Sequence, residues 1–340
     1  MADYNVWLNN WGSQAAEVIP LIKKKHEPSF RVISTTGVKN PAVMSEADEW
    51  YRETCNSKSS WEDYSKFALE ICDEHDIDII MPVRKMLEFS EHRKLFEERG
   101  IKLMLPSSHF MMRTLNDKAS TYEVLREVVP ECIPKYYKVN TVEEFKIAVE
   151  ALRKEGCGVC FKYVQDIASQ SFRIISFEKR GIDEFSSKTK HAIEYDTALE
   201  ILSSVPKFKD MMVMELLDGL EVSCDCLATS SGNIIIPRMK LNTRIQEVRR
   251  QPQLMNLCDR ILNFTGYDAP CNIQFKYEIG KTPKLLEINT RMSGGIHISE
   301  WATGINIPSI ALSQLIGVDE EWNREWKKVQ MVAREKYDKM

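Results

Sequence analysis

An acid, an amide and a guanidinium occupy alternate positions near the carboxyl end of the sequence. In LLEINTRMSGG (285–295), read as a strand, Glu287, Asn289 and Arg291 point to one side, because side chains alternate with a period of two. The strand-like segment before it, CNIQFKY, carries Gln274 on its polar face. A turn between the two segments predicts a hairpin whose polar faces lie side by side. Carboxylate and amide oxygens suit Mg²⁺, and an adjacent arginine suits a phosphoryl group or a developing oxyanion.

A simpler interpretation of this pattern is a solvent-exposed face, since an ordinary amphipathic strand also has one polar side. The residues that follow, Ser293, Gly294 and Gly295, argue mildly against it. Small residues at the end of a strand let the backbone approach a ligand. The motif alone therefore leaves a binding site and a solvated face both open.

Further upstream, other polar residues have positions that suit a nucleotide. Lys162 lies in the apolar segment GVCFKYV, and Lys118 opens a predicted helix. A lysine in such a position either extends to solvent or is held to meet phosphate. In MELLDGLE, a strand with Glu215 leads through two leucines and a turn to Glu221. The backbone of such a linker can hold a nucleobase while an acid binds the ribose, although a hairpin with surface acids fits equally well.

Alternating strands and helices are expected in the first third of the chain. Within residues 1–108 we predict strands at 4–9, 30–36 and 77–83, with an amphipathic helix at 61–75 before the third. Strands that alternate with helices indicate βαβ units and a parallel sheet.

The remainder of the chain has a different pattern, which predicts α+β structure with antiparallel hairpins. Thr141 is a plausible N-cap of an amphipathic helix, with Glu144 three residues later as in a capping box. We predict a helix over 246–266. We also predict two strands that QDIASQ joins, one before it and one after it. The segment 321–340 is ambiguous between helix and strand.

The composition excludes several classes of partner. Hydrophobic residues are 43% and charged residues 28% of 340, which is typical of a globular protein. The net charge is −4 and no basic block stands out, so we expect no nucleic acid and no membrane as partner. The first residues lack the pattern of a signal peptide, and no apolar run approaches a membrane span. We therefore expect a cytoplasmic protein.

Nine cysteines are scattered along the sequence, an odd number that we interpret as reduced. Cys157 and Cys160 have the spacing of a metal or redox pair, and Cys224 and Cys226 are a second candidate. Both pairs lie in segments that look like strands, and a zinc site normally needs two well-spaced pairs. Buried structural cysteines are the better interpretation.

Together, these motifs and their order resemble the ATP-grasp superfamily, in particular enzymes of the carbamoyl-phosphate-synthetase and biotin-carboxylase type. The layout is also similar to stand-alone bacterial ATP-grasp proteins associated with tellurium-resistance operons. The resemblance covers nearly the whole chain. The matching segments, in order, are LNDK (115–118), CFK (160–162), MELLDGLE (214–221), PRMK (237–240), NIQF (272–275) and EINTRMSGG (287–295).

The resemblance implies a fold, an activity and cofactors. The fold would be an α/β Rossmann-like (pre-ATP-grasp) domain at 1–108, followed by an α+β ATP-grasp fold. The latter would have a small linker subdomain at 109–185 and a C-terminal subdomain with the Mg-ATP site at 186–340. The activity would be ADP-forming ligation of a small-molecule carboxylate to an amine or thiol through an acyl-phosphate, with ATP and Mg²⁺ or Mn²⁺. The oligomeric state is open, with a homodimer as one candidate.

The resemblance also assigns a role to each matched residue. Two lysines would contact the ATP phosphates and the adenine side, a three-residue hinge would hold adenine, and an acid would bind ribose. Two serines of the loop after the second lysine complete the set. The nucleotide-binding residues implied by the resemblance are Lys118, Lys162, Ser169, Ser171, Glu215, Leu216, Leu217 and Glu221.

The metal ligands and catalytic residues follow from the last motifs. Gln274, Glu287 and Asn289 would hold one or two Mg²⁺ ions. Arg291 would stabilise the transferred phosphoryl group and the acyl-phosphate. Lys240, with Arg238 as a weaker candidate, would reach phosphate or a substrate carboxylate.

Two departures from the family pattern keep a second interpretation open. The loop after Lys162 reads QDIASQSFRII and has no glycine before Gly181, although glycine usually lets such a loop close over phosphate. The proline usual after the motif's asparagine is Thr290. The alternative is therefore a catalytically weakened ATP-binding regulatory module. A dinucleotide-dependent enzyme is less consistent with the sequence, because VWLNNWGSQ is not GxGxxG.

The substrates are not named by the sequence. Trp7, Asn9, Asn10 and Trp11 lie at the end of the first predicted strand, where parallel sheets bind ligands, so they are candidate pocket residues or core residues. His297 is close to the last motif and either contacts substrate or, more commonly for such a position, packs at the strand end.

Overall fold

The computed structural model describes residues 3–24, 27–164, 170–179, 181, 191–242, 245–277 and 281–332. The chain divides into two compact units. The first comprises residues 1–116, 221–274 and 287–340, and the second comprises residues 117–220 and 275–286. In the described part of the chain, no helix is long and apolar enough to cross a bilayer.

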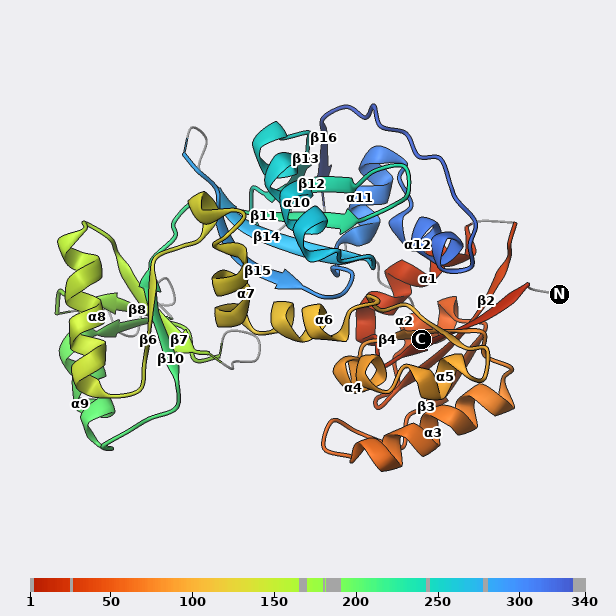
Figure 1. Cartoon of the computed structure of the whole chain (residues 1–340), viewed down its shortest axis with the longest axis horizontal. Coiled ribbons are helices and arrows are strands. Elements are labelled where there is room, and N and C mark those ends of the chain that lie inside the picture. The colour runs from red at the N-terminus through yellow and green to blue at the C-terminus, as the bar shows by residue number, and fades with distance from the viewer. Residues whose placement is uncertain are drawn as a thin grey trace. The chain divides into compact units, whose positions relative to one another are not determined.

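A five-stranded parallel sheet lies in the first unit, in the order β3-β2-β1-β4-β5 (Figure 1). The parallel pairing and the alternation with helices that the sequence predicted are confirmed, although the third predicted strand is shorter. The strands are β1 (Tyr4–Asn9), β2 (Phe30–Thr36), β3 (Glu49–Arg52), β4 (Ile79–Pro82) and β5 (Lys102–Leu103).

Helices cover both faces of this sheet, because alternate residues of its strands are apolar on both sides. Val6 and Leu8 of β1 pack with α1 and α2, whereas Trp7 packs with α3, α4 and α5. The helices of this region are η1 (Gly12–Gln14), α1 (Ala15–Lys23), α2 (Pro41–Glu46), α3 (Trp61–Glu74), α4 (Met86–Glu91), α5 (Lys94–Glu97) and α6 (His109–Asn116).

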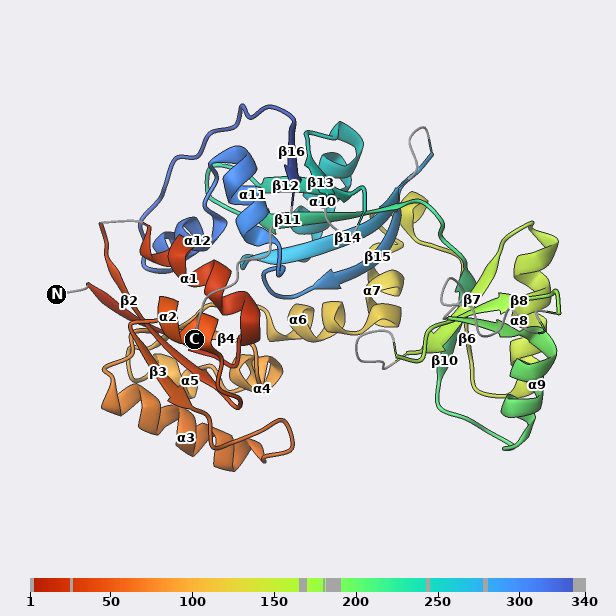
Figure 2. The ribbon, with the colours of Figure 1, turned by 180° about the vertical axis from the view of Figure 1, so that it is seen from behind.

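The second unit is built on a sheet in the order β6-β10-β7-β8-β9, with α8 and α9 packed on it (Figure 2). As predicted, Thr141 caps α8, since its side chain accepts a hydrogen bond from the Glu144 amide. The elements are α7 (Lys118–Leu125), η2 (Pro130–Cys132), β6 (Tyr136–Val139), α8 (Val142–Lys154), β7 (Val159–Tyr163), β8 (Arg173–Ser176), β9 (Ala192–Glu194), α9 (Tyr195–Ser203) and β10 (Met211–Glu215).

A third sheet has six strands in the order β15-β14-β11-β12-β13-β16. It carries most of the motifs of the second half of the sequence, and β14 and β15 are neighbours as predicted. The elements are β11 (Leu220–Leu227), β12 (Ile234–Lys240), β13 (Ile245–Val248), α10 (Pro252–Thr265), β14 (Cys271–Tyr277), β15 (Lys284–Asn289), α11 (Ile296–Thr303), α12 (Ile307–Leu315) and β16 (Val329–Val332).

Two sequence predictions in this region need correction. The helix expected over 246–266 begins only at Pro252, because proline suits the first turn of a helix and disfavours helical backbone in the residue before it. The residues before it form β13, which pairs antiparallel with β12. Strand β15 ends at Asn289, so Arg291 follows the strand rather than continuing its polar row. The ambiguous C-terminal segment includes a strand, β16.

The buried side chain of Asn9 joins the carboxyl ends of β1 and β4. Its amide nitrogen donates to the Tyr64 hydroxyl and the Arg84 carbonyl, and its oxygen accepts from the amides of Val83 and Arg84. This side chain therefore fixes the segment that follows β4.

We predict that Asn9→Ala lowers the free energy of unfolding by about 1–3 kcal/mol, because two backbone N–H groups lose their acceptor in a site that water reaches poorly. Urea denaturation at neutral pH measures the change. Asn5→Ala on the same strand is the control. Asn5 donates to the Asp76 carbonyl in an exposed hydrogen bond and accepts only a long one (3.4 Å) from Arg31, so the loss of its side chain is expected within about 0.5 kcal/mol. Equal effects of both variants would contradict the bridging role of Asn9.

Candidate functional site

One face of the six-stranded sheet changes from apolar to polar along its strands. The register pairs Ser223 with Arg238 and Asp225 with Ile236, so these side chains share a face. At one end of that face, Leu227 and Ile236 are part of the buried core with α11 and α12. At the other end are half-exposed Glu221 and Lys240. The core therefore ends, and a polar surface begins, at the level of Asp225 and Arg238.

Asp225 and Arg238 form an ion pair whose two side chains are only 1% and 2% exposed. The Arg238 Nε lies 2.8 Å from Asp225 Oδ2. Three neutral groups also donate to the carboxylate: the hydroxyls of Ser293 (2.7 Å) and Ser299 (2.6 Å), and the Asn272 amide (2.9 Å). A buried charge is tolerated only when it is paired and hydrogen-bonded, and this pair meets both conditions.

The same contacts determine the pKa of Asp225. Burial alone would raise it, but the positive charge of Arg238 and the donated hydrogen bonds outweigh burial and hold the pKa below its usual range. The carboxylate therefore stays ionised at neutral pH. Two strands, the turn after β15 and helix α11 converge on this one charge.

The turn after β15 is held against Arg238. The Nη2 of Arg238 donates to the Ser293 hydroxyl (2.7 Å), and its Nη1 donates to Gln246 on β13 (2.6 Å). A Cβ atom on Gly295 would lie 2.5 Å from that Nη1. The glycine is thus required here by the approach of a buried side chain of the protein.

The predicted metal ligands lie on β14 and β15 and offer oxygen atoms. The Gln274 amide nitrogen donates to the side-chain oxygen of Asn272 (3.0 Å). The side-chain oxygen of Gln274 is therefore directed away from Asn272. The Asn289 amide donates to Glu287 (3.4 Å), so these two share a face as predicted. One carboxylate and two amide oxygens fit Mg²⁺, which keeps several positions for water and phosphate oxygens. In the described part of the chain, no cluster of three acidic, histidine or cysteine side chains offers another metal site.

Glu221, Lys240 and Arg291 are the remaining predicted residues of the first unit. Glu221 and Lys240 form an ion pair with each other across β11 and β12. The half-buried Arg291 donates from Nη1 to the Met292 carbonyl (3.1 Å), and no ion pair of Arg291 occurs within the described ranges. A ribose at Glu221, or a phosphate at Lys240, would have to compete with the ion pair between these two residues. Most N–H groups of the Arg291 guanidinium can still donate hydrogen bonds to a ligand.

In the second unit, Lys118 and Lys162 both lie near Cys160. Burial raises the pKa of the Cys160 thiol to about 12, and the positive charges of the two lysines partly oppose this shift. Lys118 is the first residue of α7, and Lys162 is half-buried on β7. The structure therefore brings the two predicted phosphate-binding lysines into one neighbourhood.

The predicted adenine hinge joins β10 to β11. The Glu215 carboxylate accepts a hydrogen bond from the Lys135 amide (3.1 Å), and the Leu216 amide donates to the Gly158 carbonyl (2.8 Å). Leu217 follows on the same linker. Two groups of the hinge therefore have partners within the protein, which restricts the backbone groups that can meet a base.

The two loop serines differ in what can be said of them. The Ser171 hydroxyl accepts a hydrogen bond from the Tyr163 amide (2.9 Å) at the end of β7. Ser169 and residues 165–168 lie outside the described residues.

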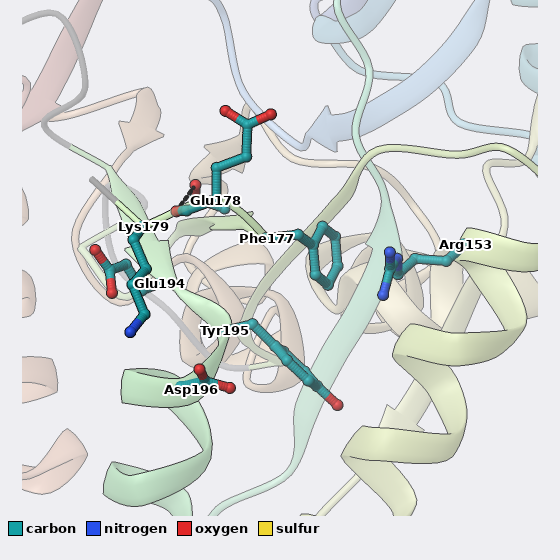
Figure 3. Close-up of a pocket in the computed structure, with 8 residues that line it drawn as sticks. Arg153, Phe177, Glu178, Lys179, Glu194, Tyr195 and Asp196 are labelled. Atoms are coloured by element: carbon teal, nitrogen blue, oxygen red, sulfur yellow. Dashed lines mark hydrogen bonds between the residues drawn. The ribbon is translucent and has the colours of Figure 1, made fainter. Parts of the chain in front are cut away.

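A separate hollow of about 500 Å³ lies in the second unit, and none of the predicted site residues lines it. Figure 3 shows Arg153 directed at the Phe177 ring, with Tyr195 beside it. The guanidinium carbon lies 3.9 Å from the centre of that ring. Arg153 is engaged with this aromatic ring, and the acidic residues Glu178, Glu194 and Asp196 outnumber the second cation, Lys179, so the hollow does not resemble a phosphate site.

Sequence reasoning missed Asp225 and considered Arg238 only weakly. The available signal was a lone aspartate in the apolar strand LEVSCDCL, followed by an arginine in IIIPRMK. A buried charge of each sign on adjacent strands predicts a pair. The serines that complete the network are 68 and 74 positions away from Asp225 in the chain and carry no local signal.

Comparison with known proteins indicates what this chain is similar to. Residues 207–337 match a family model described as "ATP-grasp in the biosynthetic pathway with Ter operon". The carbamoyl phosphate synthase large chain of Sulfolobus acidocaldarius is 23% identical over 235 residues, which are 66% of this chain. The match spans only 21% of that larger protein.

Solved structures extend the likeness to nearly the whole chain. Biotin carboxylase from Campylobacter jejuni superposes with a TM-score of 0.70 and 15% identity, over 95% of this chain and 73% of that one. N5-carboxyaminoimidazole synthetase from Staphylococcus aureus gives 0.68 and 11%, over 97% of this chain and 82% of that one. At these identities the superpositions establish a shared fold.

We predict that Gly295→Ala destabilises the protein by about 1–3 kcal/mol, because the new methyl group overlaps a guanidinium that its hydrogen bonds hold in place. Gly294→Ala is the matched control. A Cβ there would meet only the Gln14 side chain, at an ordinary 3.5 Å. Neither glycine has a positive φ, so the comparison isolates the steric contact. Thermal unfolding of both variants measures it, and equal melting temperatures would contradict the packing of Arg238 against this turn.

Proposed function

We propose that this member of the ATP-grasp superfamily is an ATP-dependent ligase that joins a small-molecule carboxylate to an amine, or to a thiol, and releases ADP. The observation that carries the proposal is the polar face of the six-stranded sheet. On this face the β14 amides of Asn272 and Gln274 continue from the buried Asp225–Arg238 ion pair, and Glu287 and Asn289 share one face of the neighbouring strand β15. The names of its relatives, a synthase, a carboxylase and a synthetase, are consistent with ligation.

The proposed roles follow the chemistry of each side chain. Glu287, Asn289 and Gln274 would hold Mg²⁺, which neutralises phosphate charge when bound. Lys118 and Lys162 would meet the phosphates as point charges.

Adenine and ribose would lie against the linker after β10. The hinge Glu215–Leu217 would contact the base, and Glu221 would bind ribose hydroxyls. Lys240 would then move from Glu221 to phosphate or to the substrate carboxylate, since one carboxylate cannot serve both partners fully. Ser169 and Ser171 would line the loop over the phosphates.

The proposed reaction has two steps. A carboxylate oxygen attacks the γ-phosphorus of ATP, the bond to the β–γ bridging oxygen breaks, and ADP leaves. The amine then attacks the acyl carbon, loses a proton and displaces phosphate. Arg291 faces the charge of the acyl-phosphate in both steps. Positioning and charge neutralisation carry this chemistry, and no covalent protein nucleophile is needed.

A second candidate function is an ATP-binding regulatory module without turnover. It is favoured by the glycine-free loop after Lys162 and by the internal hydrogen bond of the hinge at Leu216. Mg·ATP binding in calorimetry, without ADP release over a broad panel of carboxylates and amines, would support this alternative.

We predict that Glu287→Gln and Arg291→Ala each lower the rate of Mg·ATP-dependent ADP release by about 100-fold or more, because each removes charge stabilisation at the transferred phosphoryl group. A coupled assay of ADP formation with candidate carboxylates and amines measures the rates.

Glu98→Gln, a charge change at an exposed position, serves as the control and should keep the wild-type rate. If either site variant retains full turnover while its melting temperature is unchanged, the assignment of that residue is wrong.

A further inference from the structure

Arg84 lies at the carboxyl edge of the parallel sheet of the first unit, in the segment between β4 and α4. In the order β3-β2-β1-β4-β5, the chain leaves β1 toward β2 and leaves β4 toward β5, so the two connections run to opposite sides. Open parallel sheets bind ligands at the carboxyl ends of strands whose connections diverge in this way. Arg84 therefore lies where such a sheet usually holds a ligand.

The backbone of Arg84 is held by the Asn9 side chain at the end of β1. The Arg84 amide donates to the Asn9 side-chain oxygen (3.0 Å), and the Arg84 carbonyl accepts from the Asn9 side-chain nitrogen (3.1 Å). The residue after each of them, Asn10 and Lys85, has a positive φ, of 51° and 58°. Such backbone is uncommon outside glycine, and it persists where the surrounding contacts enforce it, often at functional sites.

The inner part of the Arg84 side chain is held as well. Its Nε lies 3.1 Å from Oε1 of Glu53, which follows β3, and these two side chains are 13% and 0% exposed. The Tyr64 hydroxyl donates to the same carboxylate oxygen. The Glu53 carboxylate therefore fixes the direction in which the guanidinium points.

The outer part of the Arg84 guanidinium has no partner in the part of the chain that the structure describes. No hydrogen bond or ion pair there involves Nη1 or Nη2, and neither is a buried atom, so solvent reaches both. A Cβ on Gly37, after β2, would lie 3.8 Å from Nη2, so the side chain extends across β1 toward the end of β2. Four of the five N–H groups of a rigidly held arginine are thus presented at this edge.

The charges at this edge favour an anion as the ligand. Within four residues after the ends of β1 to β5, the sequence has three cations, Lys39, Arg84 and Lys85, and one acid, Glu53. The acid is buried and paired with Arg84. The planar fork of an arginine matches two oxygens of a carboxylate or of a phosphate.

The same edge reaches the segment that carries Arg291. Pro82 and Met86, on either side of Arg84 in the chain, line a gap together with Thr290 and Arg291. A water molecule can occupy only about 20 Å³ of this gap, so the two segments nearly touch. A substrate whose reacting group lies near Arg291 can therefore extend along the edge toward Arg84.

From these observations we propose that the carboxylate substrate carries a second oxyanion, a carboxylate or a phosphate, and that Arg84 binds this group while the reacting carboxylate lies near Arg291. Arg84 is then a specificity-determining residue that Asn9 and Glu53 hold in place. The inference rests on the ligase function proposed above. The competing explanation is that Arg84 only compensates the buried charge of Glu53, in which case its terminal nitrogens bind no substrate.

The test compares acids that differ by one oxyanion. Calorimetry measures binding in the presence of Mg²⁺ and a saturating non-hydrolysable ATP analogue, which occupies the nucleotide site. The matched pairs are pimelate with heptanoate, and 6-phosphogluconate with gluconate. The wild-type protein should bind at least one of the two acids with a second oxyanion about tenfold or more tightly than its matched partner, because charge-assisted hydrogen bonds are gained. The pair that shows the preference identifies the second group as carboxylate or phosphate.

Three variants test the location. Arg84→Met should bring the two dissociation constants of the responding pair to within about twofold of each other. Arg84→Lys keeps a positive charge beside Glu53, which protects folding, but it lacks the fork and should lose most of the preference. Lys85→Met is the control, because Lys85 is the adjacent cation, is similarly buried at 14% exposed, and has its Nζ paired with Glu88 (3.1 Å). It should keep the wild-type preference.

The outcomes separate this inference from the ligase proposal. The inference is overturned if the wild-type protein shows no preference in either pair, if the preference persists in both Arg84 variants, or if Lys85→Met abolishes it equally. ADP release with the same four acids and a panel of amines tests the ligase function. A preference that depends on Arg84, without ADP release, would support the oxyanion site and contradict the ligase function. ADP release from heptanoate or gluconate that is as fast as from their partners, and unchanged in Arg84→Lys, would do the reverse.

Discussion

A single buried ion pair, Asp225 with Arg238, is the constraint on which the polar face of the six-stranded sheet depends. Both side chains are almost completely removed from water, which is costly for two charges unless all their hydrogen-bonding groups find partners. The partners come from β13, β14, the turn after β15 and α11. Because a partner lost from such a network leaves a buried charge unpaired, these elements are held in one arrangement.

This arrangement explains how one sheet face can serve both the core and a site. On the core side of the pair, Leu227 and Ile236 pack with helices α11 and α12. On the other side, the same strands present Glu221 and Lys240, and the neighbouring strand presents Gln274. The pair also accounts for Gly295, whose lack of a side chain admits Arg238. At this glycine, the group that the small residue admits is a side chain of the protein itself.

The sequence was informative wherever a short-range rule applied. Period-two alternation placed Glu287 with Asn289 on a common face, and the hydrogen bond between them agrees with it. The cap at Thr141 and the parallel sheet also followed from local signals. Contacts between distant segments could not be predicted. Ser293 and Ser299 meet Asp225 only in the folded chain, and the extent of β13 depends on its pairing with β12. The roles of the individual site residues, and the division of the chain at 108 and 185, stay predictions.

The proposed metal–nucleotide site lies on the polar face that Asp225 and Arg238 support, and anomalous X-ray scattering tests this location most directly. Crystals grown with Mn²⁺, which replaces Mg²⁺ at oxygen sites, and a non-hydrolysable ATP analogue would be measured near the manganese edge. The predicted result is an anomalous peak within coordination distance of the Glu287 carboxylate and the Asn289 amide oxygen, beside the analogue's phosphates. The contradicting result is a bound analogue whose manganese peak lies elsewhere, while Glu287 contacts neither the metal nor a water molecule that is hydrogen-bonded to the phosphates.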